Sequence, residues 1–239
     1  MSSAPATRGE FLLVACQGGA EAALCRRQQE VLPQIAKAAW RRGVVTFRLG
    51  GFDPPDTFFP DLFFNRTCLR SLGQVTGNSD AERAAAAAAL VDPTAGNGIH
   101  VWSRNPRHAV DVDAIRAALA TACGLPSAGP PIATPGDLVL DCIVDSPDRW
   151  WIGWHRAATP PSCWPGGLYP VALPKGKVSR AWLKLDEAIT TFGIPFEAGQ
   201  LAIELGASPG GACQRLLEAG LRVVGVDPAV VDERVSNHD

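Results

Sequence analysis

The sequence predicts two regions of different fold class, an α+β region first and then the start of a nucleotide-binding α/β sheet. Three observations carry this prediction. Short apolar runs alternate with helix-compatible segments from residue 11 to residue 155. A stretch with five prolines follows at 159–174. Beyond it, two apolar runs enclose a glycine-rich loop and a short helix. We therefore expect domains at 1–158 and 175–239, joined by a linker at 159–174.

Hydrophobic periodicity places the elements of the first region. A period of two, or a short apolar run bounded by turn residues, predicts strands, and a period near 3.6 predicts helices. Ser146-Pro147-Asp148 forms a turn that makes the last two strands a hairpin. The expected strands are 11–16, 44–49, 98–103, 138–144 and 150–155, and the expected helices are 20–31, 80–90 and 111–123.

Composition narrows the class of protein. The chain has 239 residues, 46% of them hydrophobic, and a net charge of −2. It has no apolar run of the ~18 residues that a membrane span needs. The first ten residues lack a basic segment followed by an apolar core, so we expect a cytoplasmic protein. The seven cysteines are scattered without a C-x-x-C pair, which predicts reduced thiols and no metal site.

The most informative stretch is Ile203-Glu-Leu-Gly-Ala-Ser-Pro-Gly-Gly-Ala212. An apolar run at 201–205 leads into this loop, a helix is expected at 212–219, and a second apolar run at 221–226 ends in an acid. An acid 21 residues after the first loop glycine can accept hydrogen bonds from a ribose diol. We expect an adenosine-containing cofactor, held by Glu204, Gly206, Ala207, Pro209, Gly210, Gly211 and Asp227.

The loop spacing distinguishes among cofactors. It is G-x-x-x-G-G, so neither the G-x-G-x-x-G pattern of dinucleotide loops nor the P-loop pattern is met. Glu204 supplies negative charge before the first glycine, which suits a ligand with a sulfonium and an ammonium group. S-adenosylmethionine has both. The alternatives are a glycine-rich turn in an unrelated α/β protein and a nicotinamide-dependent oxidoreductase, which the glycine spacing disfavours.

The segment 204–211 resembles motif I of the FtsJ-type ribose 2'-O-methyltransferases, and Ser179-Arg-Ala-Trp-Leu-Lys-Leu-Asp-Glu-Ala188 resembles their motif X. The RlmM-like members, which methylate a cytidine ribose in 23S ribosomal RNA, give the best match. The resemblance implies a Rossmann-like class I methyltransferase domain after an N-terminal THUMP-type, ferredoxin-like RNA-binding region. A weaker likeness to that region lies at 61–75. The chain departs from the family at Ala212, where a tryptophan is usual, and so lacks a large packing surface beside the cofactor loop.

The resemblance also implies that Lys184 is the first member of the family's Lys-Asp-Lys-Glu catalytic set. Methyl transfer to a 2'-hydroxyl needs a group that takes or orients the hydroxyl proton, and a lysine can do this. Spacing alone favours a surface lysine paired with Asp186, Glu187 or an RNA phosphate, and it is the motif resemblance that favours the catalytic role.

A run of basic residues lies between the two regions. From residue 149 to residue 184 there are six basic residues and no acidic one. Such a stretch can contact phosphates, and the tryptophans near it could stack on bases. The expected RNA contacts are Arg149, Arg156, Lys175, Lys177 and Arg180, with ribosomal RNA as the partner. The other interpretations are a solvated linker for the charges and a packed strand face for the tryptophans.

Only two strands of a methyltransferase sheet of about seven are recognisable, and the later catalytic residues of the family are not found in this sequence. We therefore expect a fragment or truncated product, inactive by itself. Two hypotheses follow. The first is a ribosomal RNA 2'-O-methyltransferase that uses S-adenosylmethionine, and the second is a non-catalytic RNA-binding remnant of such an enzyme.

Overall fold

The computed structural model describes residues 9–91, 96–105, 107, 109–125 and 131–237. The chain forms two compact units, Met1–Leu168 and Tyr169–Asp239. The division between them falls inside the segment 159–174 that the sequence predicts as a linker. Each unit is described by itself.

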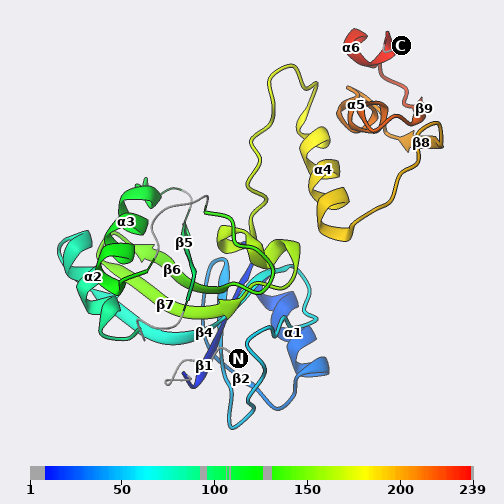
Figure 1. Cartoon of the computed structure of the whole chain (residues 1–239). Helices are drawn as coiled ribbons and strands as arrows, with labels where there is room; N and C mark the ends of the chain where they lie inside the picture. Colours follow the sequence, from blue (N-terminus) through cyan, green and yellow to red (C-terminus); the bar gives the residue numbers. More distant parts are fainter. Residues whose placement is uncertain (1–8, 92–95, 106, 108, 126–130, 238–239) are drawn as a thin grey trace. The chain divides into compact units, whose positions relative to one another are not determined.

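The first unit is built on one seven-stranded mixed sheet (Figure 1). Its strand order is β2-β3-β1-β4-β7-β6-β5, and every neighbouring pair is antiparallel except β5 with β6. The strands are β1 (Phe11–Cys16), β2 (Ala36–Arg41), β3 (Val44–Arg48), β4 (Asn65–Thr76), β5 (Gly98–Ser103), β6 (Leu138–Ser146) and β7 (Arg149–Arg156), and the helices are α1 (Glu21–Val31), α2 (Asp80–Ala88) and α3 (Val112–Cys123).

All three helices of this unit cover the same face of the sheet. Residues that pair across neighbouring strands point to the same face of a sheet. Leu12 pairs with Arg70, Arg70 with Trp154, and Trp154 with Leu140, so all four residues point to one face. Leu12 belongs to the core under α1, and Leu140 belongs to the core under α2 and α3. Figure 1 shows α2 and α3 side by side against the β5–β7 part of the sheet.

The opposite face carries a smaller core of Leu13, Ala15, Val44, Leu69, Trp102, Ile143 and Trp151. Two short 3-10 helices, η1 (Pro160–Cys163) and η2 (Pro165–Gly167), cover part of this face. A Cβ on Gly166 would lie 2.8 Å from the Trp102 ring, so only glycine allows this approach. The first half of the proline-rich segment is therefore packed, where the sequence predicts a loop.

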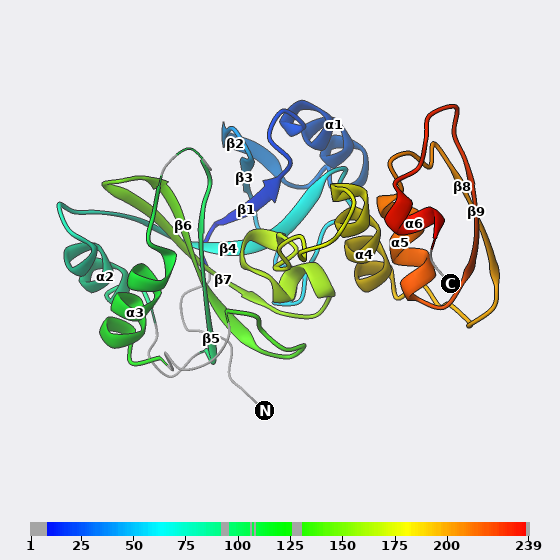
Figure 2. The same ribbon diagram turned by 90° about the horizontal axis from the view of Figure 1, so that it is seen from above.

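The second unit contains a two-stranded parallel sheet and its helices (Figure 2). The elements are α4 (Arg180–Phe192), β8 (Leu201–Leu205), α5 (Gly211–Glu218), β9 (Arg222–Val226) and α6 (Glu233–Ser236). Strand, loop, helix and parallel strand follow in the order expected for the start of a Rossmann-like sheet. Trp182 is the one residue of α4 that is buried.

Each predicted strand and helix of both units is present, with ends that differ by a few residues. Two strands were missed. β2 is exposed at every position, and its composition, Ala-Lys-Ala-Ala-Trp-Arg, has no alternation to mark a strand. β4 is irregular because its register shifts between Ser71 and Gly73. The α+β architecture of the first unit agrees with the prediction, and its THUMP-type assignment stays a prediction.

Candidate functional site

The glycine loop of the second unit joins β8 to α5. Gly206 leaves the strand with φ +81°, and Gly210 enters the helix with φ +115°, both in the left-handed region that favours glycine. Ala207, between them, is buried under β9, because a Cβ on Gly225 would lie 2.9 Å from the Ala207 Cβ. Pro209 is exposed. The loop is therefore shaped by backbone conformation and by one close strand contact.

Asp227 holds this loop in place from the end of β9. Its carboxylate accepts hydrogen bonds from the backbone N–H of Ser208 (3.0 Å) and of Ala229 (2.7 Å). These two bonds lower the pKa of Asp227 below its ordinary value. A carboxylate has about four lone-pair sites, so the group can still accept hydrogen bonds from a ribose diol.

Glu204 lies on the face of β8 that packs against α5. It pairs with Gly225 across the sheet and is partly buried. Burial and then the Glu204 charge raise the pKa of the Cys213 thiol, which lies on α5. The opposite face of this sheet is apolar and open: Leu201, Ile203, Leu205, Val224 and Val226 are all about half exposed or more.

Gly211 allows α4 to pack against the first turn of α5. A Cβ at this position would lie 2.2 Å from Ser179 Oγ and 2.9 Å from the backbone nitrogen of Trp182. Ser179 is also the residue that caps α4, since its hydroxyl accepts from the Ala181 N–H at 3.3 Å. The resemblance to motifs I and X thus concerns two segments that touch in the structure.

Because no side chain fits between Ser179 and α5, we expect Gly211→Val to lower the free energy of unfolding of the second unit by about 1–3 kcal/mol. Chemical denaturation monitored by tryptophan fluorescence would measure it, since Trp182 reports on the α4–α5 contact. Ala212→Ser is the matched control one residue further on. Equal stability of the Gly211→Val variant and the control would contradict this packing.

Polar contacts extend the α4–α5 interface. The indole N–H of Trp182 donates to Glu218 Oε2 at 2.8 Å, and Lys177 Nζ lies 2.6 Å from Glu218 Oε1 and 4.8 Å from the Trp182 ring centroid. On the same interface, Arg215 Nε lies 2.7 Å from Asp186 Oδ1. No local sequence pattern predicts this network, because Glu218 is 41 residues from Lys177.

Lys184 is exposed on α4. It is two residues after the buried Trp182, so it projects about 200° around the helix from that contact. Asp186 is taken by Arg215, which removes one of the two acids that could pair with Lys184 as a surface lysine. The lysine is therefore presented away from α5.

The expected RNA-contacting residues have different surroundings. Arg149 lies 3.7 Å from Asp145, Arg156 lies 3.7 Å from Asp56, and Lys177 is paired with Glu218. Acids outside the stretch thus partly neutralise it: Asp145 lies four residues before Arg149, whereas Asp56 and Glu218 are distant in sequence from their partners. Lys175 and Arg180 are exposed. The RNA contacts of all five residues stay a prediction.

The first unit contains a buried titratable cluster that the sequence analysis did not anticipate. His100, Asp141 and His155 lie on three adjacent strands, and the side-chain atoms with which they could bind a metal ion lie within 4.8 Å of one another. His155 Nδ1 is hydrogen-bonded to Asp141 Oδ2, and His155 Nε2 lies 2.7 Å from the Ser162 carbonyl oxygen. The Ser162 carbonyl can only accept, so Nε2 donates to it; with an ionised Asp141, Nδ1 donates as well and the ring is an imidazolium. The spacing would suit a metal ion, but neither nitrogen of His155 keeps a free lone pair.

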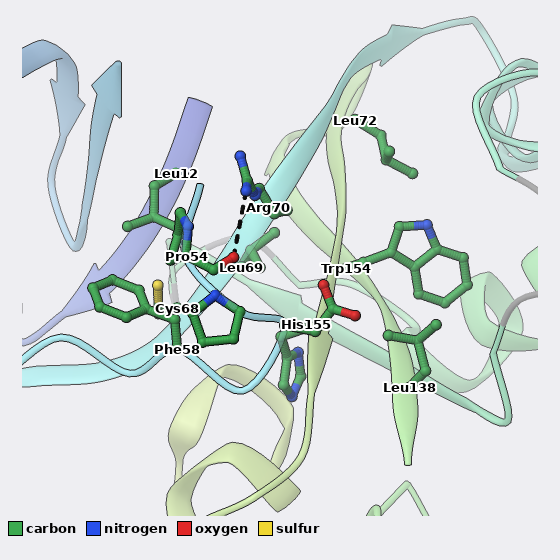
Figure 3. Close-up of a pocket in the computed structure, with 12 residues that line it drawn as sticks. Leu12, Pro54, Phe58, Cys68, Leu69, Arg70, Leu72, Leu138, Trp154 and His155 are labelled. Atoms are coloured by element: carbon green, nitrogen blue, oxygen red, sulfur yellow. Dashed lines mark hydrogen bonds between the residues drawn. The ribbon is translucent and has the colours of Figure 1, made fainter. Parts of the chain in front are cut away.

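A small cavity lies beside this cluster (Figure 3). Its volume is about 20 Å³, enough for a single water molecule. Arg70 crosses it and donates to the Pro54 carbonyl oxygen at 3.5 Å. A cavity of this size holds neither a cofactor nor a base.

Residues 177–238 match the FtsJ-like methyltransferase family. Over 91% of its length, the chain is 29% identical to the ribosomal RNA large subunit methyltransferase M of Halorhodospira halophila, and it covers 65% of that protein. It is 41% identical over 70 residues to the enzyme of the same name from Alkalilimnicola ehrlichii. This alignment covers 27% of this chain and 19% of that relative. The chain thus spans less than two thirds of the length of these relatives.

The solved structure of TrmN from Thermus thermophilus aligns with 92% of this chain and 66% of that chain at 14% identity, with a TM-score of 0.41, too low to carry an argument. The FtsJ-like match supports a methyltransferase and S-adenosylmethionine as its cofactor, and at this level it confirms the cofactor predicted from the loop. Among the described helices, none is long and apolar enough to cross a membrane.

Proposed function

We propose that this protein takes part in S-adenosylmethionine-dependent methylation of ribosomal RNA at a ribose 2'-hydroxyl, with a cytidine of 23S RNA as the target by resemblance. The observation that supports this proposal most strongly is that the two motifs lie against each other. The glycine loop and Asp227 lie at the end of the parallel sheet of β8 and β9. Helix α4, which carries Lys184, packs on α5 at Gly211.

Each part has a role in this proposal. Asp227 accepts hydrogen bonds from the cofactor ribose, and Glu204 favours its positive charge. The free N–H groups at the start of α5 suit its carboxylate. The bound cofactor would supply the methyl group, and Lys184 would take or orient the proton of the 2'-hydroxyl that receives it. The first unit, THUMP-like by resemblance, docks the RNA in the cytoplasm. The proposed RNA contacts are Arg149 and Arg156 in the first unit and Lys175, Lys177 and Arg180 in the second.

The proposal is tested by incubating ribosomal RNA and labelled cofactor with the longest form of the protein that carries these residues, and by mapping the modified nucleotide. A 2'-O-methyl group on a 23S cytidine is the expected product. Methylation of a base instead of a ribose would overturn the proposed chemistry. RNA binding without any methyl transfer would favour the non-catalytic alternative.

Asp227→Ala should weaken S-adenosylmethionine binding about tenfold, because it removes a ribose acceptor and releases the Ser208 N–H that shapes the loop. Isothermal titration calorimetry measures the affinity directly. Asp232→Ala, which removes a carboxylate paired with Arg234 in the same unit, is the matched control. An unchanged affinity in Asp227→Ala would remove this residue from the cofactor site.

A further inference from the structure

A second, larger cavity lies on the face of the first unit's sheet that the three helices do not cover. Its volume is about 340 Å³. Leu13 on β1, Thr46 on β3 and Trp151 on β7 line it. Leu13 pairs with Thr46 and with Leu69, and these residues lie on the same face of the sheet as Trp151, opposite α1, α2 and α3. Neither η1 nor η2, the 3-10 helices that cover part of this face, contributes to the described residues that line the cavity.

Aromatic side chains line part of the cavity. Phe11 on β1 and Trp151 on β7 both contribute to its lining. Phe11 is partly buried, and Trp151 is 6% exposed. Unpaired bases stack on aromatic side chains of this kind.

Polar and basic side chains lie among the mostly apolar lining residues. Thr46, Ser71 and Gln74 offer hydroxyl and amide groups, and Arg41 is exposed at the edge strand. The guanidinium of Arg48 lies 5.6 Å from the Phe11 ring centroid, on the same face. None of the described residues that line the cavity is acidic.

We propose that this cavity binds one nucleotide of single-stranded RNA, with the base against Phe11 and Trp151 and the flanking phosphates at Arg41 and Arg48. The volume lies in the range of ordinary small-ligand pockets and can hold a base and its ribose. Aromatic surfaces stack on unpaired bases, and arginines at the rim contact phosphate. The inference rests on the proposed function, since it assigns part of the ribosomal RNA contact to a defined site.

The test is the affinity of the 239-residue chain for a short, fluorescein-labelled, single-stranded oligoribonucleotide of mixed sequence, measured by fluorescence anisotropy. Phe11→Ala removes the stacking surface, and Thr46→Trp fills the cavity. Each should weaken binding about tenfold. Arg41→Gln should lower the salt slope of binding by about 0.7, the contribution of one phosphate contact in single strands. Circular dichroism shows whether each variant is folded. If Phe11→Ala or Thr46→Trp unfolds, Arg41→Gln still tests the site, because Arg41 is exposed on the edge strand.

Arg26→Gln is the matched control, because Arg26 is exposed on α1, across the sheet from the cavity. It should leave affinity and salt slope unchanged. RNA binding that is equal in wild type, Phe11→Ala and Thr46→Trp would overturn the site but leave ribosomal RNA as the substrate. S-adenosylmethionine affinity, measured on the same samples, separates the two proposals: cofactor binding without RNA binding overturns the site alone. If the wild type is a dimer, Thr46→Trp is a monomer and both bind RNA equally well, the cavity instead binds a second copy of the chain.

Discussion

Lys184→Ala should reduce ribose methylation about 10²–10⁴-fold in the longest active form of the protein, the range that a positioned proton acceptor contributes. S-adenosylmethionine affinity should stay the same, because Lys184 is exposed on α4 and projects away from the α5 contact. Single-turnover methyl transfer to ribosomal RNA, together with calorimetry of cofactor binding, measures both quantities.

Lys184→Arg separates the two possible roles of this lysine. Arginine keeps the positive charge for an RNA phosphate but does not give up a proton in proteins. It should therefore be as inactive as alanine if Lys184 acts on the 2'-hydroxyl proton. Substantial activity in Lys184→Arg would show that the lysine only contacts phosphate, which is the surface role that spacing alone allows.

Asp141→Ala should destabilise the first unit by about 3–5 kcal/mol near pH 6, because it leaves the buried His155 imidazolium without its counter-ion. Asp141 is fully buried and His155 is 4% exposed, so the imidazolium would stay shielded from bulk water after the carboxylate is lost. Urea denaturation gives the difference. Asp113→Ala, which removes an exposed partner of Arg116, should cause no measurable change. A small effect at Asp141 would show that His155 is neutral in the folded protein.

The same pair predicts how stability depends on pH. Burial alone would lower the pKa of His155, but the Asp141 carboxylate and the Ser162 carbonyl raise it above 6.5. The folded protein then binds the proton more tightly than the unfolded chain does. The stabilisation is complete below pH 6.5 and is lost as the pH rises through the raised value. The stability difference between wild type and His155→Gln should therefore shrink between pH 6 and pH 9.

His100, the third member of the cluster, contributes in the opposite sense. Burial lowers its pKa to about 4, so it stays neutral in the folded protein near neutral pH. Its contribution is present above pH 6.5 and is lost as the pH falls toward 4. His155→Gln retains His100. The difference in the free energy of unfolding between wild type and this variant at each pH therefore gives the contribution of His155 alone. A difference that grows toward pH 9 would contradict the imidazolium assignment.

The sequence by itself determined the local elements and the cofactor loop. The strands at 201–205 and 222–226, the helix between them and the acid that follows are all set by short-range patterns, since periodicity, glycine spacing and a terminal acid are readable within about 25 residues. The same holds for the hairpin of β6 and β7, whose turn lies between two adjacent strands.

Only the tertiary structure decided which side chains meet. It paired the exposed edge strand β2 with β3, joined Lys177 to Glu218 across 41 residues, and enclosed His155 between Asp141 and Ser162. It also left the aromatic cavity beside Trp151 uncovered. These contacts depend on how distant segments pack, and packing is a sum of many weak non-local interactions that no short window of sequence contains.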